Sequence, residues 1–354
     1  MSALKIFKKT LLGLSALVFI GCVSTPSSKS KPEWVDNAKT VYPETKYVSA
    51  VGEGTSRTAA EDAALGNLSK LFSTTVSVTQ TITDRYKAVF TDDSSSGSQD
   101  SDMMEQILTS SKQSSLVGAK IDDVWQNADG QYYAVAIMNK QTTSLFYANK
   151  IRQQTEDIEN LIAAAKKAAT PLEAYADYSF AVVIAEVNNE MLSLLSVVDP
   201  VAWKLNQPSY GSSNSIKLAA SEVAQKITIK VTVENDQNNR INSAFSSVFN
   251  NMNFKVWKGL ASDKTPDYLL NIAFSLEDVV LKNNDNKFCR YYINADFVEV
   301  NTGKTLTTYS VNGRDGNVSY AEAVQKTLRT AEKRIKQEYQ ANLETYLDSF
   351  VGKS

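Results

Sequence analysis

The chain has 354 residues, of which 43% are hydrophobic and 9% aromatic, with a formal net charge of −2 and no histidine. This length and hydrophobicity exclude wholesale disorder and favour two domains with buried cores, while the acidic balance argues against nucleic acid as a partner. The absence of histidine excludes Ser-His and Cys-His nucleophiles and removes the commonest zinc ligand.

The first 21 residues have the layout of a bacterial signal peptide. Three lysines, Lys5, Lys8 and Lys9, form a basic n-region. The apolar run at 11–20 that follows is about half as long as a membrane-spanning helix needs to be. No second apolar stretch that could act as a stop-transfer segment is expected downstream. Residues 1–21 are therefore predicted to be a cleaved signal peptide.

Cys22 follows the apolar run directly and is predicted to carry a lipid. The segment 18–22 (VFIGC) resembles the bacterial lipobox, in which a signal peptidase cuts before a cysteine that carries diacylglycerol. Phe19 departs from that motif, which prefers Leu, Val or Ile, and ordinary secretion with an unmodified Cys22 is the alternative. Residues 22–31 are polar and are predicted to be a flexible tether between the lipid and the folded body.

Residues 32–143 alternate between strand and helix patterns, which predicts a small α+β domain. The dipeptide Asp129-Gly130 is a strong turn signal and predicts a hairpin between two of the strands. Val76, Val78 and Ile82 alternate with polar residues, as in a half-buried strand. The expected strands cover 46–51, 75–82, 117–125 and 132–138, and the expected helix carries an apolar stripe of Ala60, Ala64, Leu68 and Leu71.

Residues 144–206 are predicted to form a helical hairpin, because apolar residues from Leu145 onward recur every three or four positions. Thr170-Pro171-Leu172-Glu173 restarts the helix, with Thr170 as N-cap and Glu173 completing a capping box. Residues 207–215 (QPSYGSSNS) are predicted to be a linker.

Residues 216–354 are predicted to form a second α+β domain, so the whole chain is assigned to the α+β class. The pattern at 241–252 predicts an amphipathic helix, and 301–304 (NTGK) predicts a turn between the last two strands. The expected strands cover 227–233, 254–257, 268–274, 288–300 and 306–311, and a long closing helix covers 320–346.

The order of four short motifs resembles the bacterial Lpp-twenty family of membrane-associated lipoproteins over residues 32–150. These motifs are PEWV at 32–35, VGEG at 51–54, AAEDAA at 59–64 and YYAVA at 132–136. More weakly, the hairpin at 301–304 before a long helix resembles the periplasmic domains of curli-secretion and penicillin-binding-protein-activator lipoproteins. These resemblances imply envelope assembly, pore or scaffold roles and supply no catalytic residues.

No residue pattern predicts a catalytic, cofactor or metal site. Gly52-Glu53-Gly54 lacks the third glycine of a dinucleotide motif, so a tight strand-to-helix turn is expected. The acidic segment 92–102 lacks the ligand spacing of an EF-hand, which favours a solvated loop over a calcium site. Cys289 is expected to be a packed, unreactive thiol, and the four tryptophans are expected to be core residues.

Three functions stay open, led by a non-enzymatic scaffold lipoprotein that acts through protein contacts. That role predicts a broad apolar surface patch or self-association on the helical hairpin or the closing helix. A peptidoglycan- or glycan-binding module is the second, marked by clustered aromatics in a groove. A carboxylate-based glycan hydrolase is the third and needs two carboxyl groups about 5 to 10 Å apart. The expected location is the outer membrane, facing the periplasm, with surface display as the alternative.

Overall fold

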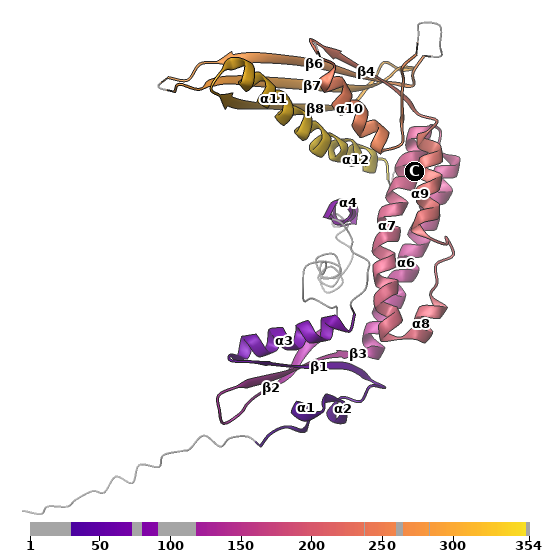
Figure 1. Cartoon of the computed structure of the whole chain (residues 1–354). Coiled ribbons are helices and arrows are strands. Elements are labelled where there is room, and N and C mark those ends of the chain that lie inside the picture. The colour runs from indigo at the N-terminus through magenta and orange to yellow at the C-terminus, as the bar shows by residue number, and fades with distance from the viewer. Residues whose placement is uncertain are drawn as a thin grey trace, which may run out of the picture.

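The structure is a computed structural model that describes residues 30–72, 80–90, 118–236, 238–259, 265–282 and 284–351. The predicted signal peptide, Cys22 and the tether as far as residue 29 lie outside these ranges. Figure 1 shows a small sheet at one end of a column of long helices and a larger sheet at the other end. The fold is therefore of the α+β class, as the sequence predicted.

The N-terminal sheet has three antiparallel strands in the order β1-β3-β2. β2 and β3 form the predicted hairpin, and Gly130 between them has a positive φ of 83°. Helix α3 covers one face of the sheet, while α1 and α2 pack on the other face through Trp34 and Tyr42 (Figure 1). The elements are α1 (Glu33–Asp36), α2 (Ala38–Val41), β1 (Tyr47–Gly54), α3 (Arg57–Lys70), β2 (Ala119–Gln126) and β3 (Tyr132–Asn139).

Gly52 and Gly54 lie within β1 and allow α3 to approach the strand closely. A Cβ on Gly52 would lie 2.1 Å from the backbone nitrogen of Ala64 and 2.6 Å from the carbonyl oxygen of Ala60. A Cβ on Gly54 would lie 2.6 Å from the backbone nitrogen of Ala60. The expected turn at this motif is wrong, because both glycines are paired with β3. Their role is to leave room for the helix.

Helix α4 covers Gln80–Phe90, so the last residues of the strand predicted at 75–82 are helical. Ile82 and Tyr86 lie four positions apart and belong to the same hydrophobic cluster, as expected for one face of a helix. The strand prediction is therefore wrong at Ile82. Val76 and Val78, which carried the rest of that prediction, lie outside the described residues.

The column contains α6 (Lys140–Lys167) and α7 (Pro171–Val198), which form the predicted helical hairpin. The capping box is confirmed. The Glu173 N–H donates to Thr170 Oγ1 (3.2 Å), and the Thr170 N–H donates to Glu173 Oε2 (3.2 Å). These bonds satisfy two backbone N–H groups at the break between the helices.

Helix α7 is the central helix of the column. It has 28 residues and contains a window of mean hydropathy 1.5, so by length and composition it could cross a membrane. However, 61% of that window is buried inside the protein, against α6 and α9 (Ser213–Ala224) among others. The expectation of no further apolar stretch is therefore wrong, and the apolar composition of α7 is accounted for by its place in the core.

Helix α9 (Ser213–Ala224) begins inside the segment predicted to be a linker. Ser212 caps it, and Ile216, Ala220 and Ala224 are buried at helical spacing. An ion pair between Lys217 and Glu186 (2.6 Å) joins α9 to α7. The column thus extends beyond the predicted hairpin, and the predicted domain boundaries stay a prediction because one hydrophobic cluster runs through all the parts.

The C-terminal sheet has the strand order β5-β4-β6-β7-β8. β4 pairs in parallel with β5 and β6, and the other pairs are antiparallel. Helices α10, α11 and α12 line one side of this sheet (Figure 1), and a π-helical turn, η1, joins the last two as one closing helix. The elements are β4 (Thr228–Glu234), α10 (Arg240–Asn251), β5 (Lys255–Val256), β6 (Tyr268–Val279), β7 (Lys287–Glu299), β8 (Thr305–Asn317), α11 (Tyr320–Arg334), η1 (Ile335–Tyr339) and α12 (Gln340–Asp348).

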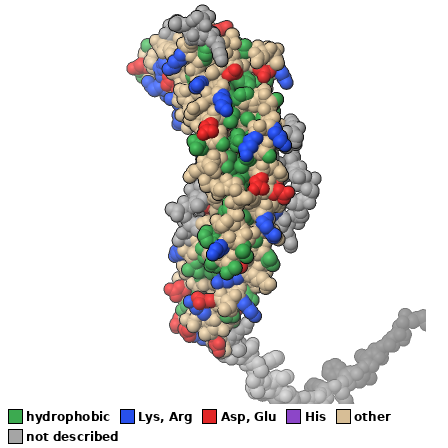
Figure 2. Space-filling model, turned by 90° about the vertical axis from the view of Figure 1, so that its right-hand side faces the viewer, with side chains coloured by type: hydrophobic (Ala, Val, Ile, Leu, Met, Phe, Trp, Pro, Cys, Tyr) green, Lys and Arg blue, Asp and Glu red, His purple; other side chains and the backbone are tan. Residues whose placement is uncertain are grey.

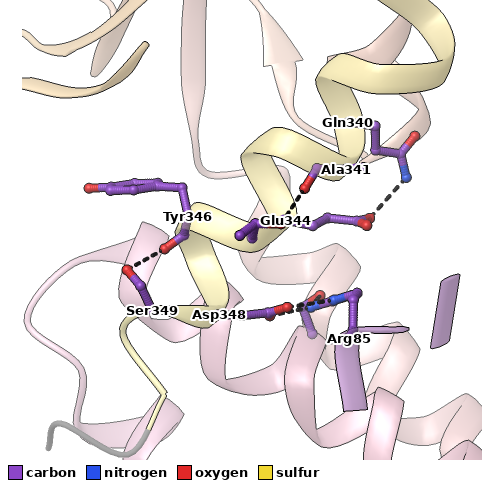
Figure 3. Close-up of polar contacts among 9 residues, drawn as sticks. Arg85, Gln340, Ala341, Glu344, Tyr346, Asp348 and Ser349 are labelled. Atoms are coloured by element: carbon purple, nitrogen blue, oxygen red, sulfur yellow. Dashed lines mark hydrogen bonds and ion pairs between the residues drawn. The ribbon is translucent and has the colours of Figure 1, made fainter. Parts of the chain in front are cut away.

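A buried ion pair joins α4 to the end of the closing helix (Figure 3). Arg85 Nε donates to Asp348 Oδ2 (2.8 Å), and Arg85 Nη2 donates to Asp348 Oδ1 (2.6 Å). Arg85 Nη2 also donates to Ser179 Oγ on α7 (3.2 Å). The two charged side chains are only 14% and 7% exposed, so this contact fastens three helices together.

Candidate interaction surface

Two of the predicted features lie outside the described residues: Cys22 and the acidic segment 92–102. The lipidation of Cys22 therefore stays a prediction. Among the residues that the structure describes, no group of three or more Cys, Asp and Glu side chains could hold a metal ion.

Cys289 lies in β7 and is fully buried. Burial raises the pKa of its thiol, which keeps the thiol protonated and unreactive. The expectation of a packed, small hydrophobic residue at this position is confirmed.

Two carboxyl groups with raised pKa values lie on α7, but they do not form a catalytic pair. Burial raises the pKa of Glu190 to about 7. Burial, followed by the charge of Glu173, raises the pKa of Asp177 to about 6. At 1.5 Å per residue, Asp177 and Glu190 are about 20 Å apart along the helix, well beyond the separation that glycoside hydrolysis needs.

A cavity of about 480 Å³ lies between the loop after β4, the end of β6 and α11. Asp236 is the one carboxylate among its lining residues, and it accepts hydrogen bonds from the N–H groups of Arg240 (3.0 Å) and Asn242 (2.9 Å). Both of its oxygens are therefore used at the start of α10. This cavity supplies no carboxylate pair for hydrolysis.

The four tryptophans stand in three separate places. Trp34 is buried, donates to Asp123 Oδ2 (2.9 Å), and packs near Trp125 on the face of the N-terminal sheet covered by α1 and α2. Trp203 lies on α8 (Pro200–Leu205) and is 39% exposed, so the expectation of a core position is wrong for this residue. Trp257 lies beyond β5 with the Lys230 ammonium 5.2 Å from its ring. The tryptophans do not line one groove, so they do not form a glycan-binding site together.

Exposed apolar side chains gather around α8 (Pro200–Leu205), at the end of the column nearer the N-terminal sheet. Val201 is 71% exposed, Leu205 is 80% exposed, and Leu145 at the start of α6 is 59% exposed. Figure 2 looks onto this side of the column, where hydrophobic side chains lie between charged ones. We name as the α8 surface the residues Leu145, Val197, Val201, Trp203 and Leu205.

Asp199 holds α8 in place. Its Oδ1 accepts hydrogen bonds from the N–H groups of Val201 (3.1 Å) and Ala202 (2.9 Å), and its Oδ2 accepts one from Ser144 Oγ (2.9 Å). The Ala202 N–H, helped by the Ser144 hydroxyl, holds the pKa of Asp199 below its usual value. The bond to Ser144 brings Leu145 beside α8, so the surface is presented on fixed helices.

The α8 surface lies within 144–206, where the scaffold hypothesis placed an apolar patch. The sequence pattern nevertheless did not indicate its members, because Leu145 is one position of the three-and-four repeat that predicts the helical hairpin. A signal was present in the sequence: Val201 and Leu205 lie four positions apart after the capping residue Asp199, which places them on one side of a short helix.

Residues 32–139 match the family described as LPP20 lipoprotein. The match confirms the family resemblance seen in the sequence and supports a lipoprotein of the cell envelope. No curated protein matches the chain. The weaker resemblance of the C-terminal part to curli-secretion and penicillin-binding-protein-activator lipoproteins stays a prediction.

Several solved structures are similar to parts of the chain. A secreted protein of Helicobacter pylori has a TM-score of 0.38 at 12% identity, covering 82% of this chain and 97% of its own. A minor lipoprotein of Acinetobacter baumannii has a TM-score of 0.28 at 8% identity, covering 35% and 94%. Rare lipoprotein B of Shewanella oneidensis has a TM-score of 0.25 at 12% identity, covering 36% and 98%. Scores this low support no argument about function.

Proposed function

Starting from the family match over residues 32–139, we propose that this is an outer-membrane lipoprotein that faces the periplasm and acts as a scaffold for other envelope proteins. Its anchor is the lipid on Cys22, and its role is binding without catalysis. The observation that carries the scaffold role is the α8 surface.

The chemistry of the α8 surface suits a protein partner. Isolated apolar residues on a protein surface are ordinary, but Val201 and Leu205 are both exposed on one short helix that also carries Trp203. The exposed Leu145 follows Ser144, which bonds to the cap of that helix. The energetic centres of protein interfaces are apolar or aromatic side chains on ordered backbone. Burying an exposed Val or Leu side chain fully contributes about 1.5–3 kcal/mol, so two such residues can dominate an interface.

Site-specific photo-crosslinking in intact cells tests this proposal. A photoreactive residue replaces Leu205 in the full chain, and the control chain carries it at Lys336, an exposed position on η1 in the closing helix. We expect defined envelope proteins to be crosslinked from position 205 and not from position 336. Mass spectrometry of the same sample identifies the acyl group on the Cys22 peptide and so tests the anchor separately.

A pair of matched variants links any crosslinked protein to the α8 surface. Leu205→Ser changes a highly exposed residue of this surface, and Leu218→Ser makes the same change at an exposed position on α9. Neither change should lower the melting temperature. We expect Leu205→Ser to reduce co-purification of the crosslinked protein at least about tenfold and Leu218→Ser to leave it unchanged. Adducts with lipid alone would contradict the scaffold role.

A further inference from the structure

Strand β6 runs past the end of β4, its neighbour on one side. Pairing between them ends at Glu234 and Ala273, whereas β6 continues to Val279 and stays paired with β7 on its other side throughout. Figure 1 shows β6, β7 and β8 extending beyond β4. Among the described residues, no strand pairs with 274–279 on the β4 side.

The backbone of this overhang presents hydrogen-bonding groups on its β4 side, where no described strand pairs with it. The Phe274 carbonyl points to the β4 side, where it accepts a hydrogen bond from Asn235 Nδ2 (3.3 Å). Because backbone groups alternate in direction along a strand, the N–H and C=O groups of Leu276 and Asp278 point to the same side. The register with β7 is continuous to Val279, so no bulge breaks this alternation.

The cavity of about 480 Å³ lies at this overhang. Phe274 and Leu276 line it from β6, and Val324 and Leu328 line it from α11. A chain lying beside β6 would therefore place alternate side chains over an apolar floor. The next strand position thus offers both the backbone partners and the side-chain pocket that an added strand requires.

The charged groups of the cavity are already paired. Asp236 accepts from two backbone N–H groups of α10, and Arg240 is ion-paired with Glu332 and donates to Gln325 Oε1 (2.9 Å). A chain entering the cavity meets no unpaired charge there, so its inward side chains suit the site when they are uncharged.

We infer that the overhang of β6 is a binding site for an extended segment of a partner protein, which continues the β4–β6 ladder. The segment spans about six residues, donates to and accepts from the backbone of Leu276 and Asp278, and carries uncharged apolar side chains at alternate positions facing Val324 and Leu328. This site is separate from the α8 surface and stands without it.

A synthetic peptide tests the inference on the purified full chain in detergent. The probe is a six-residue peptide of alternating valine and threonine with lysines at its ends and a fluorescent label. Its control is the same peptide with N-methylated amides at the positions that would face β6, which keeps the side chains and removes the donors. Binding is followed by fluorescence anisotropy, and protection of Leu276 and Asp278 by amide hydrogen exchange.

A matched pair of protein variants tests the pocket. Val324→Glu places a charge in the cavity lining, and Val318→Glu makes the same change at an exposed position before α11. We expect the probe to bind and to protect the amides of Leu276 and Asp278, the control peptide not to bind, and Val324→Glu alone to weaken binding at least about tenfold.

Three results would overturn the inference. The first is no binding of the probe, or binding that the N-methylated peptide reproduces. The second is equal affinity in the two glutamate variants. The third is full protection of the Leu276 and Asp278 amides in the free chain, since that would show that the edge is already covered.

Discussion

Removing Arg85 tests how firmly the parts of this molecule are held together. Arg85→Met deletes the guanidinium but keeps the aliphatic stem, and it leaves the Asp348 carboxylate in a site where that side chain is only 7% exposed. The variant loses two hydrogen bonds to Asp348 and one to Ser179. Removing one partner of a buried ion pair typically costs about 3–5 kcal/mol, because the remaining charge stays desolvated. We expect a loss of about 3 kcal/mol, since both groups retain slight solvent contact.

Urea unfolding, followed by circular dichroism and tryptophan fluorescence, measures this loss. The double variant Arg85→Met/Asp348→Leu removes both charges and should recover most of the lost stability, to within about 1 kcal/mol of the natural chain. Arg57→Met is the control, because the Arg57–Glu61 pair on α3 is exposed, and its unfolding midpoint should not change measurably. A loss below about 1 kcal/mol for Arg85→Met, or a double variant no more stable than the single one, would refute the buried-pair reasoning.

Two further stability predictions follow from α3 and α7. Gly52→Ala should lower the free energy of unfolding by at least about 2 kcal/mol, because its Cβ would meet the backbone of Ala64. Gly66→Ala should raise it by about 0.5–1 kcal/mol, because nothing lies within 4 Å of the added Cβ. Equal effects of the two variants in thermal melts would contradict the close packing of α3 on β1. Folding raises the pKa of Glu190 from 4.5 to about 7, so the unfolded chain releases this proton first and native stability falls as the pH rises from 4.5 to 7. Glu190→Gln should reduce that fall in urea titrations at pH 5 and pH 8, and an unchanged pH dependence would show that Glu190 is solvated in the native state.

Local signals in the sequence predicted much of the secondary structure. The capping box at Thr170 and Glu173 placed the start of α7, and Asp129-Gly130 placed the β2–β3 hairpin. These features depend on residues only a few positions apart in the chain, so they can be predicted without knowledge of the tertiary structure. The family resemblance worked for the same reason, since its motifs are short and ordered, and the match over residues 32–139 confirms it.

Other elements were missed because distant packing decides them. Ile82 reads as part of a strand, yet α4 is a helix packed against α7 and α12, and Arg85 meets a partner 263 positions away. The polar residues around Ser212 are typical of a linker, yet they cap α9, which buries Ile216, Ala220 and Ala224 in the core. Tertiary packing stabilises a helix even where the local sequence pattern is that of a strand or a linker, provided that the helix buries at least a narrow apolar stripe.

The candidate sites also divide into features that depend on local sequence and features that depend on distant packing. The sequence by itself predicted an export signal and a lipid on Cys22, excluded histidine chemistry and indicated the α+β class, because each depends on composition or local order. Only the tertiary structure decided that Leu145 and Leu205 are exposed, or that β6 extends past β4 beside a cavity. Exposure and strand pairing depend on which distant segments cover a residue, and an apolar side chain has the same hydrophobicity in the sequence whether it ends in a core or on a surface.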